Sequence, residues 1–229
     1  DFNPVENRVK VHDLPELDRW ALKRFSYLND KIVGAYERYE FHSIYQDLNY
    51  FCGTTLSSFY LDIIKDRLYT AGTDSTLRRS AQTVLYDILE GMLKLMSPIL
   101  SFTAAETWEH LFHLDSKAPL SKSIFFTEFS TFSDEIMDEA LEKKWDKLKD
   151  VRSEITRALE IARRNKVIGH PLEAEVIIQA DKKLDEFLQS EWASLREISI
   201  VSSLRREEEV ADGEIEPFVS EEIEGLVVM

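Results

Sequence analysis

The chain has 229 residues, of which 44% are hydrophobic and 31% are charged, and its formal net charge is −15. This length can bury one large or two small hydrophobic cores, and no apolar run reaches the roughly 18 residues that a membrane-spanning helix needs. The N-terminal residues lack the basic and apolar regions of a signal peptide, and the single cysteine, Cys52, excludes a disulfide within the chain. We therefore expect a cytoplasmic protein in which Cys52 fills space on an apolar helix face.

Two long helices are predicted in the first 70 residues. The segment Asp13–Glu16 has the residues of a helix start, and apolar side chains then recur at three-, four- and seven-residue steps to about Tyr39. The same spacing predicts a second helix over residues 42–69. Gly53 and the two threonines that follow it form a weak point where this helix can bend.

A third helix is expected after a cap at Asp74 or Ser75, with Leu77 among its core-facing residues. Pro98 should end or kink it, because proline cannot donate the backbone hydrogen bond that a helix interior needs. Residues 103–113 predict a short helix, which opens with the capping-box pattern Thr-x-x-Glu.

The middle of the chain predicts one extended piece and one long helix. Residues 124–126 are three consecutive apolar side chains in a polar stretch, which is consistent with a short extended segment. Ser133 or Asp134 is expected to open a helix that continues to about Lys166 with a regular apolar stripe. Its length and many charges suggest a spine that joins two modules.

The last 60 residues change character. The pattern predicts strands over residues 174–179, 198–202 and 226–229, and a helix over residues 182–195. The acidic stretch Glu207–Glu224 is expected to be a mobile loop. The predicted fold is therefore mainly α, an antiparallel helix bundle followed by a small α/β module. Its expected parts are a bundle over residues 1–132, a connecting helix over 133–168 and the module over 169–229.

The negative charge bears on which partners the chain can bind. Phosphate-binding surfaces are normally basic, so a net charge of −15 argues against RNA or DNA. Residues 207–229 carry nine acidic and no basic side chains, which leaves −6 for the rest of the chain. A local basic patch on a mildly acidic body therefore stays possible.

One segment has a distinctive order of residues. Ser57–Thr70, with the sequence SSFYLDIIKDRLYT, is an amphipathic helix, and Leu14–Leu22 reads LPELDRWAL. Together they resemble the bacterial-type isoleucyl-tRNA synthetases. Further segments match in the family's order: Asp1–Pro4, Arg78–Thr83, Pro98–Trp108, Ile168–Gly169 and Leu172–Ala174. Single matches such as Pro98–Trp108 are shared with the valyl and leucyl relatives, whereas the pair of segments named first points to the isoleucyl branch.

The resemblance covers nearly the whole chain and implies a helical region that grips the anticodon arm of isoleucine tRNA, rather than DNA or a membrane. The family's activation motifs HIGH and KMSKS are absent from these residues, so we expect no catalytic residue and no cofactor here. By resemblance the full-length enzyme uses ATP and Mg²⁺, carries a cysteine-rich zinc module and is a monomer. The first bundle helix is expected upstream of Asp1, so this fragment can self-associate through an uncovered apolar groove.

Four cations are the candidate tRNA-binding residues. Lys65 and Arg67 end one predicted helix, Arg78 and Arg79 begin the next, and the short link can hold them close together. Guanidinium and ammonium groups there can meet phosphates, and arginine can also stack on an unpaired base. The alternative is ordinary ion pairing, and the sequence offers four partners for it: Asp62, Asp66, Asp74 and Asp87.

Other features also have two interpretations. The basic run Arg163–Lys166 can bind phosphate or complement the C-terminal end of its helix. Tyr36, Tyr39 and Tyr50 can stack on bases, although core packing suits most of them better. The pair His110-x-x-His113 can hold a metal or form a polar helix end. As a whole, the chain can instead be the corresponding region of a valyl or leucyl relative, or a helical protein-interaction module.

Overall fold

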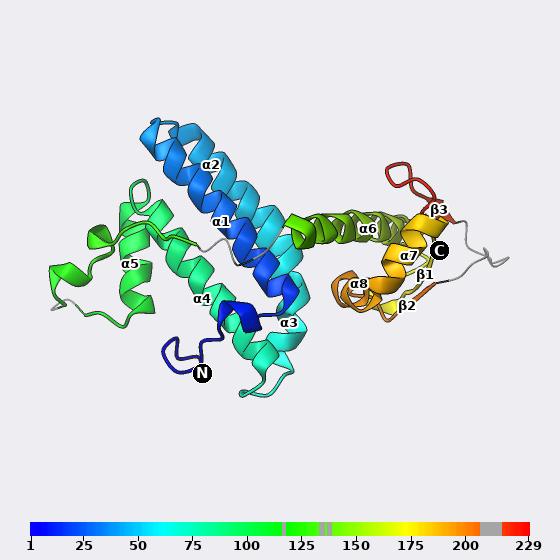
Figure 1. Ribbon diagram of the computed structural model, residues 1–229, viewed down its shortest axis with the longest axis horizontal. Helices are drawn as coiled ribbons and strands as arrows, with labels where there is room; N and C mark the ends of the chain where they lie inside the picture. Colours follow the sequence, from blue (N-terminus) through cyan, green and yellow to red (C-terminus); the bar gives the residue numbers. More distant parts are fainter. Residues whose placement is uncertain (116–117, 133–135, 137–138, 207–216) are drawn as a thin grey trace. The chain divides into compact units, whose positions relative to one another are not determined.

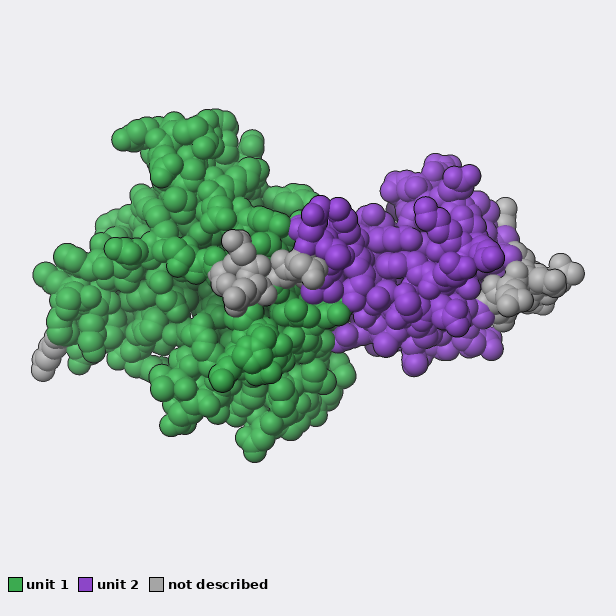
Figure 2. Space-filling view, viewed as in Figure 1, with its two compact units in different colours: residues 1–138 green, residues 139–229 purple. Residues whose placement is uncertain are grey.

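The computed structural model describes residues 1–115, 118–132, 136, 139–206 and 217–229. The chain forms two compact units, Asp1–Asp138 and Glu139–Met229, which Figure 2 shows in different colours. The first unit is helical, and the second combines helices with a small mixed sheet. The predicted fold class is thus confirmed. None of the helices in the described ranges is both long and apolar enough to cross a membrane.

The first unit is built around α1 (Figure 1). This helix packs against α2, η2 and α4, and α4 also contacts α3 and α5. Its core contains the fully buried side chains of Trp20, Phe25 and Tyr60. The elements of the unit are η1 Val11–Asp13, α1 Glu16–Glu37, α2 Phe41–Tyr50, η2 Phe51–Tyr60, α3 Leu61–Tyr69, α4 Thr76–Met96, α5 Ser101–Leu111, η3 Leu120–Lys122 and η4 Ile124–Phe126.

The predicted helices are present, but several of their starts were wrong. Asp13 lies in η1 rather than at a cap, because the chain enters α1 directly from an extended Pro15 without any side-chain cap. Ser75 does precede α4, yet its side chain forms no capping hydrogen bond. Leu77 is 49% exposed, since it lies in the first turn of α4, before the buried stretch begins at Ser80. Thr103 lies inside α5, which begins two residues earlier.

The second predicted helix runs without a break through α2, η2 and α3, but its middle has a wider hydrogen-bonding pattern. Residues Phe51–Tyr60 form a π-helical segment, in which the N–H of Leu61 donates to the carbonyl of Leu56. The predicted weak point at Gly53 lies inside this segment. A π segment adds a residue to the helical repeat and changes which side chains face inward. It buries both Phe59 and its neighbour Tyr60 against the core.

The prediction of an extended segment at residues 124–126 was wrong, because these residues form the 3₁₀ turn η4. The strands of the described residues all belong to the second unit, so this segment has no ladder to join. The Trp108 indole N–H donates to the Lys122 carbonyl at 3.0 Å, and Ile124 packs beside Trp108 and Ala104. The turn therefore buries one apolar side chain and exposes Phe125 and Phe126, which follow it.

The second unit packs α6 against α8 and β4. The sheet order is β2-β1-β4-β3, with β1 parallel to β2 and antiparallel to β4, and β3 antiparallel to β4. The predicted stripe on α6 is confirmed at Trp145, Leu148, Val151, Ile155 and Leu159, all of which are buried. The elements are α6 Glu139–Arg164, η6 Pro171–Glu173, β1 Glu175–Gln179, α7 Lys182–Ser190, α8 Trp192–Ser199, β2 Ser203–Arg206, β3 Phe218–Val219 and β4 Val227–Val228.

Two predictions about the second unit were wrong. The strand expected over residues 198–202 is absent: its first two residues, Ile198 and Ser199, end α8, because Leu195 and Ile198 are spaced to complete a buried helical stripe. The chain then turns at Ile200, whose φ is 52°, and only afterwards forms β2. The helix expected over residues 182–195 is two helices separated at Glu191. The predicted strands near residues 174–179 and 226–229 are confirmed as β1 and β4.

Some expectations fall on residues without a described structure. The helix start at Ser133 or Asp134 lies outside the described residues, and so do positions 207–216 of the acidic stretch. The boundaries of the three expected parts also stay a prediction. The structure groups α6 with the sheet that follows it, because α6 buries its apolar stripe within the second unit.

Candidate nucleic-acid interface

The four candidate cations lie around the junction of α3 and α4, but they differ in exposure. Lys65 and Arg67 are two residues apart on α3, so they point to different sides of the helix. The Lys65 side chain is 62% exposed, whereas that of Arg67 is 9% exposed. Lys65 donates to Asp62 at 2.8 Å, and this hydrogen bond raises the pKa of its ammonium group. Lys65 is thus the one of this pair that solvent or RNA can reach.

Arg67 takes part in a buried polar network that joins three elements. Its Nη1 lies 3.1 Å from Oδ2 and 3.3 Å from Oδ1 of Asp18, which is fully buried on α1. The hydroxyl of Tyr60, at the end of η2, donates to the same carboxylate at 2.7 Å. Burial, and then the negative charge of Asp18, raise the pKa of Tyr60 well above its ordinary value. The Arg67 guanidinium is thus mostly buried and bonded to Asp18, while its expected contact with RNA stays a prediction.

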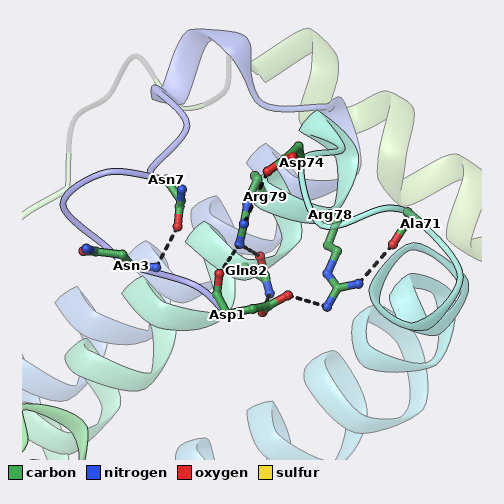
Figure 3. A network of polar contacts seen from close by, with 8 residues as sticks. All are labelled: Asp1, Asn3, Asn7, Ala71, Asp74, Arg78, Arg79 and Gln82. Carbon is green, nitrogen blue, oxygen red and sulfur yellow. Dashed lines mark hydrogen bonds and ion pairs between the residues drawn. The ribbon is translucent and has the colours of Figure 1, made fainter.

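Arg78 and Arg79 join the first turns of α4 to the N-terminal segment (Figure 3). Arg78 donates to the Asp1 carboxylate at 2.7 Å and to the carbonyl of Ala71 at 3.0 Å. Arg79 donates to the Asp1 carbonyl at 2.7 Å and to the Gln82 side chain at 3.0 Å. Their side chains are 20% and 12% exposed. Both guanidinium groups are therefore mostly buried and hydrogen-bonded to other parts of the same chain.

The structure does not gather the four cations on one exposed surface. The expected alternative, ion pairing, holds for Lys65 with Asp62 and for Arg79 with Asp74, the latter at 3.9 Å. The principal partners, Asp1 and Asp18, were missed. Asp18 carried a signal that sequence reasoning could have used, because it follows Leu17 on the apolar face of α1, where an acidic residue requires a buried partner.

The end of α6 holds a second group of cations. Arg163 and Arg164 lie in its last turn, and Lys166 follows with φ of 60°. The N–H of Lys166 donates to the carbonyl of Arg163 and that of Val167 donates to the carbonyl of Ala162, which is the Schellman pattern of a helix C-terminus. All three cations are exposed.

The candidate stacking aromatics separate into one packed and two exposed residues. The Tyr36 hydroxyl donates to the carbonyl of Leu95 at 2.7 Å, and its ring stacks on Phe129 with a centroid separation of 5.8 Å. Burial raises the pKa of Tyr36 to about 12. Tyr39 and Tyr50 are exposed, so core packing does not explain them.

The histidine pair lies at the end of α5. His110 is in the last turn, and His113 follows the helix with φ of 52°. Within the ranges that the structure describes, no three His, Cys, Asp or Glu side chains come together in a way that could hold a metal ion.

The sequence profile of the anticodon-binding domain of tRNA ligases matches residues 18–178 of this chain. The chain belongs to this anticodon-binding domain family. Three relatives are named isoleucine–tRNA ligase. The relative from Desulfotalea psychrophila is 57% identical over 228 residues, that from Desulfitobacterium hafniense 45% over 205, and that from Syntrophotalea carbinolica 43% over 213. These alignments cover 100%, 90% and 93% of the chain.

The chain spans about a quarter of the length of these relatives, with 24%, 22% and 22% of each covered. The part that matches the anticodon-binding domain begins in α1 and ends in β1, so it includes all of α6. The family domain therefore extends past the helical first unit, and both groups of cations, at the α3–α4 junction and at the end of α6, lie within it.

Proposed function

We propose that this chain is the anticodon-arm-binding region of an isoleucine–tRNA ligase and carries out no chemistry itself. The observation that carries the proposal is the match to the anticodon-binding domain profile, together with 57% identity along the whole chain to a protein of that name. The contribution of such a region is positional. It holds the anticodon arm so that the distant acceptor end of the tRNA reaches the catalytic site.

The partner is isoleucine tRNA, and the working enzyme is an ATP-dependent, cytoplasmic ligase that uses Mg²⁺ and carries zinc in another part of its chain. None of these cofactors has a proposed site within the present residues. Identity to proteins named isoleucine–tRNA ligase favours this partner over valine or leucine tRNA. It also disfavours a free-standing protein-interaction module, because the match extends over a recognised tRNA ligase domain.

Titration of fluorescently labelled isoleucine tRNA with the chain at two salt concentrations tests the proposal. We expect weak binding that falls steeply with salt, because the contacts are mostly ionic while the chain is net acidic. Valine and leucine tRNAs serve as competitors. No binding at low salt would contradict the proposal. Equal competition by all three tRNAs would retain RNA binding but remove the assignment to isoleucine.

To test whether the cations at the α3–α4 junction contribute to tRNA binding, a variant must leave the buried Asp18–Arg67 network intact. We therefore propose the triple substitution Lys65→Gln, Arg78→Gln and Arg79→Gln, with Arg67 kept because it neutralises Asp18. The matched control neutralises three exposed lysines of the same unit, Lys10, Lys31 and Lys122. A contribution to tRNA binding would lower the affinity in the first variant and not in the control, with both variants showing the wild-type circular dichroism.

A further inference from the structure

The C-terminal end of α6 is a basic segment in an acidic chain. Residues 161–172 include no Asp or Glu, and they carry three basic side chains, those of Arg163, Arg164 and Lys166. Arg163 pairs with Glu160 at 2.9 Å. Arg164 and Lys166 are exposed, and neither forms an ion pair with any residue in the described part of the chain. Among the residues that the structure describes, two exposed cations at this end of the second unit thus have no ion-pair partner.

A purely structural role does not account for Lys166. Cations in the last turn of a helix complement its dipole, which explains Arg163 and Arg164. Lys166 lies beyond that turn, and the last carbonyls already accept the N–H groups of Lys166 and Val167. Its positive φ is a conformation that glycine adopts with less strain than lysine. Tyr39 and His113 also take a positive φ where glycine would be less strained, so the lysine charge, rather than the turn, distinguishes this helix end.

The first acidic residue after this segment, Glu173, already has hydrogen-bond partners. Glu173 accepts hydrogen bonds from the backbone N–H of Gly169 at 2.8 Å and of His170 at 3.3 Å. These bonds lower the pKa of Glu173 and hold its carboxylate against the backbone of the turn. His170 is also engaged, because its Nδ1 accepts from the N–H of Leu172.

A second acid-free run differs from this one. Residues 19–29 also hold three cations, but these are only partly exposed on α1. Lys23 lies over the ring of Tyr27 at 4.9 Å, and Arg24 lies over Trp20 at 5.7 Å. Because these side chains already contact aromatic rings of their own helix, the end of α6 is the better placed of the two runs to bind a polyanion.

We propose that this basic end, residues 161–172, binds phosphate groups of the tRNA backbone through Arg163, Arg164 and Lys166. The inference rests on the proposed function and names a contact region for it. Arginine can hold a phosphate through two parallel hydrogen bonds, and lysine adds a point charge. The segment lies within residues 18–178, the part of the chain that matches the anticodon-binding domain.

The test compares the whole chain with the triple variant Arg163→Gln, Arg164→Gln and Lys166→Gln in tRNA titrations from low to high salt. For each phosphate that is no longer neutralised, the slope of log affinity against log salt should flatten by about 0.7 to 0.9. We expect the triple variant to neutralise about two to three fewer phosphates and to bind more weakly at low salt. The matched control, Lys182→Gln with Lys183→Gln, removes two exposed lysines from the start of α7 in the same unit and should leave the slope unchanged.

A single variant separates binding from folding. Lys166→Gly removes the charge and relieves the positive φ, so it should raise the midpoint of thermal unfolding while weakening tRNA binding. Lys166→Arg keeps the charge and should retain the wild-type salt slope. An unchanged slope in the triple variant, with wild-type binding intact, overturns this inference alone. Failure of the wild-type chain to bind tRNA at low salt overturns the proposed function together with it.

Discussion

The carboxylate of Asp18 lies fully buried on α1 and is held by Arg67 of α3, whose Nη1 is 3.1 Å from Oδ2. Tyr60 donates a third hydrogen bond to the same group at 2.7 Å. Asp18 and Arg67 belong to the segments that most resembled the synthetase family, LPELDRWAL and SSFYLDIIKDRLYT. Part of that resemblance therefore reflects how α1, η2 and α3 are joined, rather than contact with RNA.

Removing Arg67 should be severely destabilising. Arg67→Met leaves Asp18 buried without its cation, and breaking one side of a buried ion pair costs about 3–5 kcal/mol. Urea unfolding followed by circular dichroism measures the loss. The control Lys65→Met, on the exposed side of the same helix, should change the stability by no more than about 0.5 kcal/mol. Similar effects of the two substitutions would show that the Asp18–Arg67 pair is not needed for folding.

Two glycines in helical segments should respond oppositely to alanine. A Cβ at Gly91 of α4 would lie 2.4 Å from Cε1 of Phe25, whose buried ring also packs against Phe51 and Phe132. Gly91→Ala should therefore destabilise the chain by about 1–3 kcal/mol through overpacking. Gly53 has open space at the corresponding position, so Gly53→Ala should stabilise it by up to about 1 kcal/mol. Thermal unfolding of the two variants tests this contrast.

Alkaline pH should weaken the first unit through Tyr36. Its pKa is raised from 10.0 to about 12, so the folded state keeps a proton that the unfolded state begins to release near pH 10. Stability that is fully present below pH 10 is then lost as the pH rises towards 12. In Tyr36→Phe this loss should be smaller, although stability at pH 7 falls by about 0.5–1.5 kcal/mol because the bond to Leu95 is gone. Unfolding free energies at pH 8 and pH 11 provide the comparison.

Neutralising the acidic stretch should strengthen tRNA binding only at low salt. Deleting residues 207–229 is unsuitable for this test, because it removes β4 and the buried side chains of Leu226 and Val228. The substitutions Glu207→Gln, Glu208→Gln and Glu209→Gln instead change the net charge from −15 to −12. Their effect on affinity should disappear as salt shortens the Debye length, which is about 10 Å at 0.1 M. In urea unfolding, the deletion variant should have a lower free energy of unfolding than the variant with the three substitutions.

The sequence alone determined the elements whose apolar pattern is long and regular. The helices α1, α4 and α6 follow from repeats at three- and four-residue steps, and β1 follows from a short apolar run. Short elements were harder to predict, because the local pattern of apolar residues does not distinguish a short strand from the end of a helix. The run at residues 198–202 has the alternation of a strand, but its first residues complete the buried face of α8. Whether such a segment forms a β-strand or a helix depends on which elements pack against it.

Tertiary structure alone decided the exposure and the partners of the candidate cations. Lys65, Arg67, Arg78 and Arg79 are close in sequence and look equivalent there, yet their exposure ranges from 62% to 9%. Their partners are distant in sequence, since Asp1 is 77 residues from Arg78 and Asp18 is 49 residues from Arg67. A cation can bind RNA only if folding leaves its charged group exposed. That condition is set by packing between helices, which the order of residues along one helix does not contain.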